Sequence, residues 1–324
     1  MAATIFLKTP CRADPSFWAG TAEQYTAAAG AARDAIERVV AGGGPRVQLL
    51  IGGFAIRRPD GPERLRQQQL LNSGALEFAN AISVHLQAFD CRSFGCAAVG
   101  DSAEANYLSM QSNLAYFRNF SRQCRGGNSS SVQIWDTETG IHDAGFFAGL
   151  RGPGLPPPQC LPRPNFREAA ARLVIGEALL QAEGVAAHFY YAQYEVPHEE
   201  YDTDMKRILN SANMLDLTLA PRPKLLARIG FANAIAGCAL PPQLTRPTEG
   251  LWLFEYSGCE PQGRPPSSPG AGRVLLMWSE AGRVAVPTAV SAGAWVTDLF
   301  GNVVARPNAS ATVFASTDPS YLHW

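Results

Sequence analysis

The sequence has almost no net charge, no long uninterrupted apolar run and no glycine-rich phosphate-binding motif. Its 324 residues carry a formal net charge of -1, which gives no electrostatic basis for binding nucleic acid or acidic membranes. The most apolar stretch, AAARLVIGEALLQAEGVAAHFYYA, is interrupted by Arg172, Glu177 and Glu183, so we expect no membrane-spanning helix. No G-x-G-x-x-G sequence opens a predicted helix. We therefore expect no cofactor, no nucleic-acid partner and no membrane partner.

Metal-ligand spacing is also missing. The seven cysteines are scattered without a zinc-type pair of pairs, although Cys91 and Cys96 in DCRSFGC are close enough to close a small disulfide loop. The acidic run PHEEYDTD, residues 197–204, has no matching ligand cluster elsewhere, so a solvated loop is favoured over a cation site. We expect no metal.

The compartment stays open at this stage. The N-terminal sequence MAATIFLKTP has too short an apolar stretch to predict a signal peptide. Three N-x-S/T sequons, at Asn119, Asn128 and Asn308, would matter only in a secreted protein, and such triplets often arise by chance.

Helical and apolar strand-like segments alternate through residues 1–240. Thr21 is a candidate N-cap with Gln24 at the capping-box position, and three glycines followed by Pro45 end that helix. Apolar runs follow helical segments four times, which is typical of a parallel sheet with helices packed outside. We expect neighbouring parallel strands near residues 46–54, 81–89, 132–138 and 185–195.

Residues 241–324 have a different composition. Short β-rich runs such as GLWLFEYSG and GRVLLMWSEAG are separated by glycine, proline, asparagine and serine, which predicts a small antiparallel β-sandwich domain. The segment PPQLTRP before them is predicted to be an exposed, proline-rich linker. The sequence therefore predicts two domains, 1–240 and 241–324.

The order of these segments resembles a known family. A strand ending WDTETG is followed by GVAAHFYYAQYE, and then by VLLMWSEAG, VTDLFGN and DPSYL. This order is similar to the large clan of retaining (β/α)8-barrel glycoside hydrolases, especially xylosidase- and iduronidase-like members with a C-terminal β-sandwich. The resemblance implies an α/β fold: a partial (β/α)8 (TIM-type) barrel, roughly strands five to eight, followed by an antiparallel β-sandwich.

The resemblance also implies site residues and a carbohydrate substrate. Glu138 falls on the catalytic nucleophile at the end of strand seven, and His85 falls on a strand-six histidine near the sugar. The alternative for Glu138 is an acid that caps the following segment, and for His85 a core histidine. Trp135 fits a sugar-stacking platform and a barrel-wall residue equally well.

A second group of candidate substrate-binding residues lies near the end of the eighth-type strand. Tyr191, Tyr194 and Glu195 are the members of this group, and ordinary packing is the alternative for each. Asp136, two residues before Glu138, is predicted to be a hydrogen-bonding support rather than a second catalyst.

The sequence departs from the clan at the acid/base. The clan has an Asn-Glu pair before the helix that FWAGTAEQYTAAAGAARDAI resembles, whereas this sequence has MAATIFLKTPCRADPSFWAGT there. We therefore expect an N-terminally truncated barrel. Retaining hydrolysis needs two carboxyl groups about 5 to 5.5 Å apart, and Glu195 is the nearest candidate partner for Glu138.

Three hypotheses follow. The chain is a retaining glycoside hydrolase or a fragment of one, and as an isolated chain it is expected to be inactive on ordinary glycosides. Alternatively, it is a catalytically inactive, carbohydrate-binding remnant of such an enzyme, or an unrelated α/β protein whose acidic residues fall at strand ends by accident. A half barrel would also leave the RVQLLIGG strand without a neighbour, so we expect self-association through this open edge.

Overall fold

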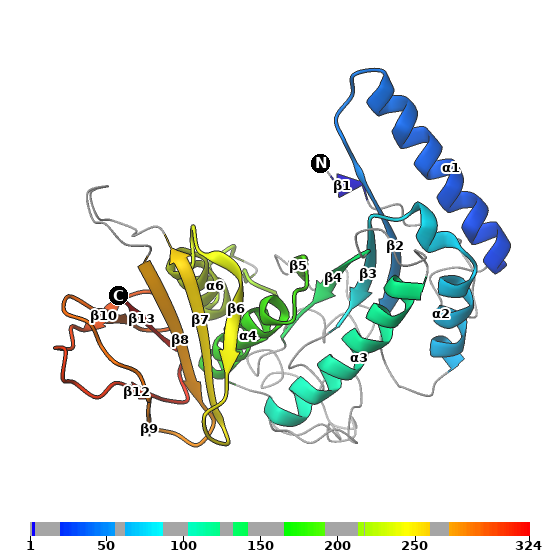
Figure 1. The fold of residues 1–324 in the computed structure, drawn as a ribbon. Helices are drawn as coiled ribbons and strands as arrows, with labels where there is room; N and C mark the ends of the chain where they lie inside the picture. The colour runs from blue at the N-terminus through cyan, green and yellow to red at the C-terminus, as the bar shows by residue number, and fades with distance from the viewer. Residues whose placement is uncertain are drawn as a thin grey trace. The chain divides into compact units, whose positions relative to one another are not determined.

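The computed structural model of the chain describes most of its residues (Figure 1). The described ranges are 2–3, 20–55, 62–86, 103–123, 132–141, 165–191, 213–216, 218–259 and 272–324. The chain forms two compact units: Met1–Leu86, Leu108–Thr139 and Val185–Phe189 make the first, and Gln87–Tyr107, Gly140–Gly184 and Tyr190–Trp324 make the second. None of the helices in the described ranges combines the length and hydropathy that crossing a bilayer requires.

The first unit is built on a five-stranded sheet whose strands follow one another in chain order. The strands are β1 (Ala2–Ala3), β2 (Gln48–Ala55), β3 (Ala81–His85), β4 (Gln133–Thr139) and β5 (Ala187–Tyr190). The pairs β1–β2, β2–β3 and β3–β4 are parallel. Ile51, Ile82 and Ile134 are paired across three strands and are all buried. The predicted parallel, neighbouring strands near residues 46–54, 81–89 and 132–138 are therefore confirmed, and β5 lies beside β4 as predicted.

The edge of β2 is partly covered. Ala2 and Ala3 of β1 pair with Gln48 and Leu49 of β2. The expectation that the RVQLLIGG strand has no neighbour is thus wrong at these two positions, because residues that the sequence left unassigned form a short strand beside it. Self-association through the rest of this edge stays a prediction.

A glycine allows β2 and β3 to approach closely. The sheet register shifts between Gly52 and Phe54, and Gly52 has φ +130°. A Cβ atom at Gly52 would lie 2.2 Å from the carbonyl oxygen of Ser83, so any residue other than glycine would clash with this oxygen. Only glycine fits this backbone conformation and this spacing together.

The described helices between β1 and β4 are α1 (Ala22–Ala41), α2 (Pro62–Asn72), the short 3-10 helix η1 (Ala75–Phe78) and α3 (Ala103–Gln123). The start of α1 is where the sequence predicts it. The capping box of α1 is present: the Gln24 amide donates to Thr21 Oγ1 at 3.2 Å, and the Thr21 amide donates to Gln24 Oε1 at 2.8 Å. The ring of Phe117 in α3 stacks on Phe54 of β2 at 6.0 Å, so α3 is anchored to the sheet.

In its described residues, the second unit combines the helices α4 (Phe166–Ala182) and α6 (Pro223–Ala234) with antiparallel sheets. The larger sheet has the strand order β11-β10-β13-β8-β7-β6, and a smaller one pairs β12 with β9. The bounds are β6 (Ala239–Thr245), β7 (Leu251–Cys259), β8 (Gly272–Ser279), β9 (Val284–Ala285), β10 (Trp295–Thr297), β11 (Val303–Ala305), β12 (Phe314–Ala315) and β13 (Ser320–His323).

The core of this unit joins residues from both sheets. Its buried members are Leu251, Leu253, Leu275, Met277, Val286, Val290, Ala294, Val296, Val313, Ala315 and Leu322. They come from β7, β8, β10, β12, β13 and the segments between them, so apolar side chains of the two sheets share one interior. The predicted antiparallel β-sandwich is confirmed. The predicted domain boundary near residue 240 stays a prediction.

The prediction that PPQLTRP is a linker is wrong. Residues 241–245 of this segment belong to β6, which pairs with β7 through Gln243 and Glu255. The register shifts between Ala239 and Gln243, so the irregularity spans Pro241 and Pro242. Because β6 is the last strand of the sheet, the missing N–H groups of two prolines are tolerated there. Proline content was therefore a poor guide to a linker.

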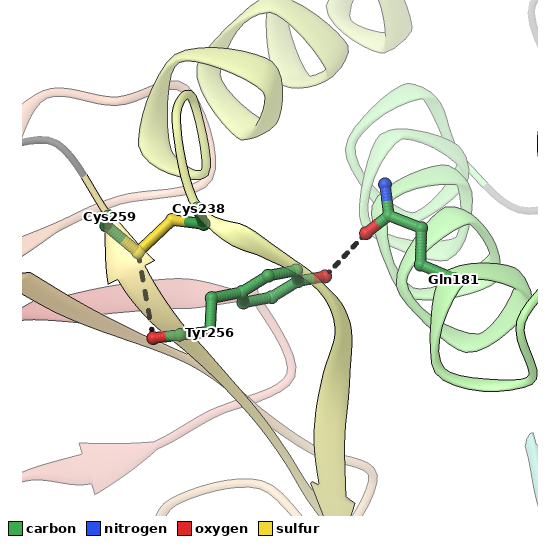
Figure 2. The surroundings of a disulfide bond; sticks show 4 residues. All are labelled: Gln181, Cys238, Tyr256 and Cys259. Carbon is green, nitrogen blue, oxygen red and sulfur yellow. Dashed lines mark hydrogen bonds between the residues drawn. A yellow bond between two sulfur atoms is a disulfide. The ribbon is translucent and has the colours of Figure 1, made fainter.

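A disulfide closes the start of this sheet. Cys238, just before β6, is bonded to Cys259 at the end of β7 (Figure 2). Three residues before Cys259, the hydroxyl of Tyr256 donates to Gln181 Oε1 of α4 at 2.9 Å, and this hydrogen bond links the sheet to that helix. The pair suggested by the sequence, Cys91 and Cys96, lies outside the described residues.

Gly230 in α6 predicts one stability effect. A Cβ atom there would lie 2.8 Å from the backbone carbon of Phe300 and 2.9 Å from the carbonyl oxygen of Leu299. Because these are backbone atoms, Gly230→Ala is expected to lower the free energy of unfolding by about 1–3 kcal/mol, measured by urea denaturation. Ala232→Ser, at an exposed position of the same helix, should change it by less than about 0.5 kcal/mol. An equally stable Gly230→Ala protein would contradict the close packing.

His323 predicts a pH dependence of stability. Its ring stacks on Trp295 at 4.9 Å, and burial lowers its pKa from 6.5 to about 4. The unfolded chain then binds more protons than the folded chain between these two values, so stability should fall as the pH falls from 6.5 to 4 and level off below. For a partly exposed ring we expect a loss of about 2 kcal/mol. His323→Gln should flatten this part of a stability-against-pH profile, and an unchanged slope would count against it.

Candidate functional site

The carboxyl ends of β3 and β4 bring His85 and Glu138 together. Val84 pairs with Asp136 in the parallel ladder, so the residues that follow in each strand reach the same edge of the sheet. His85 Nδ1 lies 3.5 Å from Glu138 Oε2. The side chain of His85 is 6% exposed and that of Glu138 is 39% exposed. The predicted position of Glu138 beside His85 is confirmed by this distance.

The electrostatics leave His85 neutral near pH 7. Burial lowers the pKa of His85 below 6.5, and the charges of Glu138 and Asp136 oppose this shift with smaller effect. The distance of 3.5 Å is longer than an ordinary N–H···O hydrogen bond of about 2.7–3.2 Å. The Glu138 carboxylate is therefore in contact with a neutral ring rather than neutralised by a tight ion pair, and part of it faces solvent.

Asp136 has a different environment, although it is only two residues away. Its side chain is fully buried. Its carboxylate accepts hydrogen bonds from the Leu86 amide at 3.0 Å and from the Thr139 hydroxyl. His188 of β5 contributes a hydrogen bond, with Nδ1 2.8 Å from Asp136 Oδ2. The carboxylate thus links β4 to the end of β3 and to β5, in agreement with the predicted supporting role.

An aromatic pair and a pair of hydroxyls lie on the same sheet. Trp135 of β4 stacks on Phe189 of β5, with ring centroids 5.9 Å apart and an interplanar angle of 27°. Phe189 is 47% exposed, so the pair presents apolar surface. Two residues after Trp135 in β4, the Thr137 hydroxyl lies 2.6 Å from the Ser83 hydroxyl in β3. Because side chains alternate along a strand, Trp135 and Thr137 share one face of β4.

The remaining predicted substrate-binding residues are only partly placed. Tyr191 follows β5 and is exposed, and it belongs to the second unit. Tyr194 and Glu195 lie outside the described residues. Within the described ranges, no three histidine, cysteine, aspartate or glutamate side chains are grouped as metal ligands.

Two contributors were missed from the sequence. His188 and Phe189 stand within AAHFYYA, which was used only to predict a strand. Their alternation, one residue toward Asp136 and the next toward Trp135, follows from the strand itself. Placing β5 beside β4 would have been enough to suggest both contacts.

Comparisons with known proteins bear on the fold. No protein-family model and no curated protein sequence matches the chain. Among solved structures, it is similar to a family 39 glycoside hydrolase from the gut symbiont Bacteroides cellulosilyticus WH2, with a TM-score of 0.60 over 92% of the chain and 17% sequence identity. The chain has the fold of a glycoside hydrolase. It also resembles a family 51 α-L-arabinofuranosidase from Bifidobacterium longum, with a TM-score of 0.52 over 94% of the chain and 13% identity.

This likeness defines what the two kinds of sheet correspond to. The parallel sheet with its helices is part of a (β/α)8 glycoside hydrolase barrel, and the antiparallel sheets form the accompanying β-sandwich. The chain spans 54% of the length of the family 39 structure and 63% of the family 51 structure. The fold implied by the sequence resemblance is therefore confirmed.

Proposed function

We propose that the chain carries the nucleophile of a retaining glycoside hydrolase, and that Glu138 is this nucleophile. The observation that carries the proposal is the position of Glu138 beside His85 at the carboxyl ends of two neighbouring parallel strands. Barrels of this type build their active sites at that end of the strands. The glycoside hydrolase fold of the chain supports the assignment.

Each side chain has a distinct role in the proposed site. Glu138 attacks the anomeric carbon and forms a covalent glycosyl-enzyme intermediate. His85 contacts the sugar as a neutral ring. Protonation of His85 below pH 6.5 would pair it with Glu138 and slow the attack. Side chains alternate along β4, so Trp135 lies on the opposite face from Glu138 and its stacking surface would serve a sugar bound on that other face.

The acid/base has to be a second carboxyl group about 5 to 5.5 Å from Glu138. Asp136 is unsuited to this role, because it is fully buried and engaged with Leu86, Thr139 and His188. Glu195 is the first residue in the chain to test for it, and Tyr191 and Tyr194 are further candidates for binding the substrate.

The proposal predicts weak hydrolysis by the isolated chain. General acid catalysis contributes about 10² to 10⁴-fold, so unactivated glycosides should turn over negligibly if no acid is in place. Aryl glycosides with very good leaving groups need little acid assistance and should react slowly. Robust hydrolysis of an unactivated disaccharide would show that a residue such as Glu195 supplies the acid.

Covalent trapping tests the nucleophile directly. The purified chain is incubated with 2-deoxy-2-fluoro xylosides and arabinofuranosides that carry dinitrophenolate, and then analysed by intact mass and peptide mapping. We expect one sugar adduct on Glu138 and no adduct on the Glu138→Gln variant. Labelling of the unmodified protein should slow below pH 6.5, and the His85→Gln variant should not show this slowing. An adduct on another residue, or none from any of these sugars on folded protein, would refute the assignment.

The alternative, carbohydrate binding without catalysis, is favoured by the exposed Trp135–Phe189 pair. Aromatic stacking on a sugar needs no acid and no nucleophile. Quenching of tryptophan fluorescence by xylo-oligosaccharides should then be retained in Glu138→Gln and lost in Trp135→Phe/Phe189→Ala. Binding of this kind without any covalent adduct would select this alternative.

A further inference from the structure

An exposed turn of the β-sandwich presents one of the three sequons. Asn308, Ala309 and Ser310 are all exposed, and the Ala311 amide donates to the Asn308 carbonyl at 3.0 Å to close the turn. The side-chain oxygen of Asn308 accepts from the Ser310 amide at 3.3 Å and from the Ser310 hydroxyl at 3.1 Å. The hydroxyl of the third sequon residue is therefore in contact with the carboxamide of the first.

The turn keeps both polar groups of the acceptor motif exposed on one short loop. The N-x-S/T motif places a hydroxyl two residues after the asparagine, and the motif is used on surface loops. A turn that folds the hydroxyl back onto the carboxamide brings the two groups of the motif together, with the small residue Ala309 at its tip. The Asn308 side chain is accessible to a large enzyme and a large donor.

The sequon at Asn119 does not have this arrangement. Asn119 lies in α3, and Ser121 is buried with its hydroxyl donating to the Val132 carbonyl at 3.0 Å. The helix and this hydrogen bond keep the hydroxyl away from the Asn119 carboxamide. The third sequon, at Asn128, lies outside the described residues. Among the described sequons, Asn308 alone has acceptor geometry.

A second, independent observation concerns the compartment. The bond between Cys238 and Cys259 is a structural disulfide that joins two strands of the sandwich. Disulfides of this kind form and persist in oxidising compartments such as the secretory pathway. Asparagine-linked glycans are added in the same compartment.

The neighbourhood of Asn308 also suits a glycan. β11, which ends three residues before Asn308, is the last strand on its side of the sheet. Val303 is 53% exposed and Val304 is 59% exposed on this strand. An exposed apolar edge strand invites pairing with other chains, and natural proteins cover such edges. A hydrated sugar chain beside β11 would cover it.

We propose that Asn308 is an N-glycosylation site. In this reaction the Asn308 Nδ2 atom forms a bond to the anomeric carbon of an oligosaccharide carried on a lipid diphosphate. The bond from that carbon to the diphosphate oxygen breaks, the lipid diphosphate leaves with the electron pair, and one amide proton passes to a base of the transferase. The modification does not depend on the role of Glu138.

The test uses the natural protein and a set of variants. The protein purified from the cells that make it is treated with a peptide N-glycosidase in heavy-oxygen water, which converts a glycosylated asparagine to labelled aspartate. We expect the label at Asn308. The full chain, fused behind a cleavable leader, is also translated in the presence of microsomes and its gel mobility is measured. The Asn308→Gln and Ser310→Ala variants should each lack the mobility shift that one glycan causes. Ser310→Thr and Asn119→Gln should keep it.

Several results would overturn the proposal. They are an unlabelled Asn308 peptide in the natural protein, free thiols at Cys238 and Cys259 before reduction, and a mobility shift that Asn308→Gln leaves unchanged. Because Ser310→Thr keeps a hydroxyl at this exposed position and Ser310→Ala removes it, loss of the shift in the alanine variant alone reports the acceptor hydroxyl rather than folding. Retention of the shift in Ser310→Ala would likewise refute the assignment.

Discussion

Replacing Asp136 by alanine is expected to lower the free energy of unfolding by about 3–5 kcal/mol. The carboxylate is fully buried, and it compensates the His188 ring, the Leu86 amide and the Thr139 hydroxyl. Its removal leaves these groups buried without their partner, which costs more than the loss of one exposed interaction. Urea denaturation followed by circular dichroism would measure the change.

Glu138→Ala is the matched control, since it removes a carboxylate from the same strand two residues away. Glu138 is 39% exposed and its histidine contact is long, so we expect a change below about 1 kcal/mol. The two variants should therefore separate a structural carboxylate from a chemical one: Asp136→Ala loses stability, whereas Glu138→Ala loses covalent labelling. Equal stabilities for the two would show that Asp136 is not the supporting group that its contacts indicate.

The double variant Cys238→Ser/Cys259→Ser is expected to lose about 3 kcal/mol of stability. The disulfide closes a loop with a sequence separation of 21 residues, and removal of such a cross-link frees chain entropy in the unfolded state. Thermal unfolding, compared with and without a reductant, would measure the effect. Reductant should lower the midpoint of the wild-type chain toward that of the double variant.

The same measurement has an internal control. Reductant should leave the midpoint of the double variant unchanged, because no other disulfide is expected to support the β-sandwich. If full reduction leaves the thermal unfolding midpoint of the wild-type chain unchanged, the bond does not stabilise the protein.

Local signals predicted the elements of the fold well. The start of α1 was set by Thr21 and Gln24, whose reciprocal hydrogen bonds need only residues three apart. The strand near 46–54 was visible because a buried parallel strand is apolar over several consecutive positions, as Leu49, Leu50 and Ile51 are. The position of Glu138 beside His85 was inferred from the resemblance. These residues are 53 positions apart, and they can be placed at one edge of the sheet only when the order of the strands is known.

Non-local partners were not predictable in the same way. The hydrogen bond of His188 with Asp136 joins two strands, and nothing in either strand alone specifies it. The disulfide partners of Cys238 could not be chosen among seven cysteines from spacing alone. β6 was missed because Pro241 and Pro242 lower strand propensity everywhere except at a sheet edge, and position in the sheet is a property of the fold.

The two prolines of β6 also limit how the protein can misassemble. A sheet grows from one molecule to the next when an end strand offers a regular row of N–H and C=O groups to an incoming strand. Pro241 and Pro242 lack N–H groups, and the register shift that spans them interrupts the regular spacing of this row. The β6 end of the sandwich is therefore a poor template for fibril elongation, and polymers that propagate by strand addition would have to grow from elsewhere on the molecule.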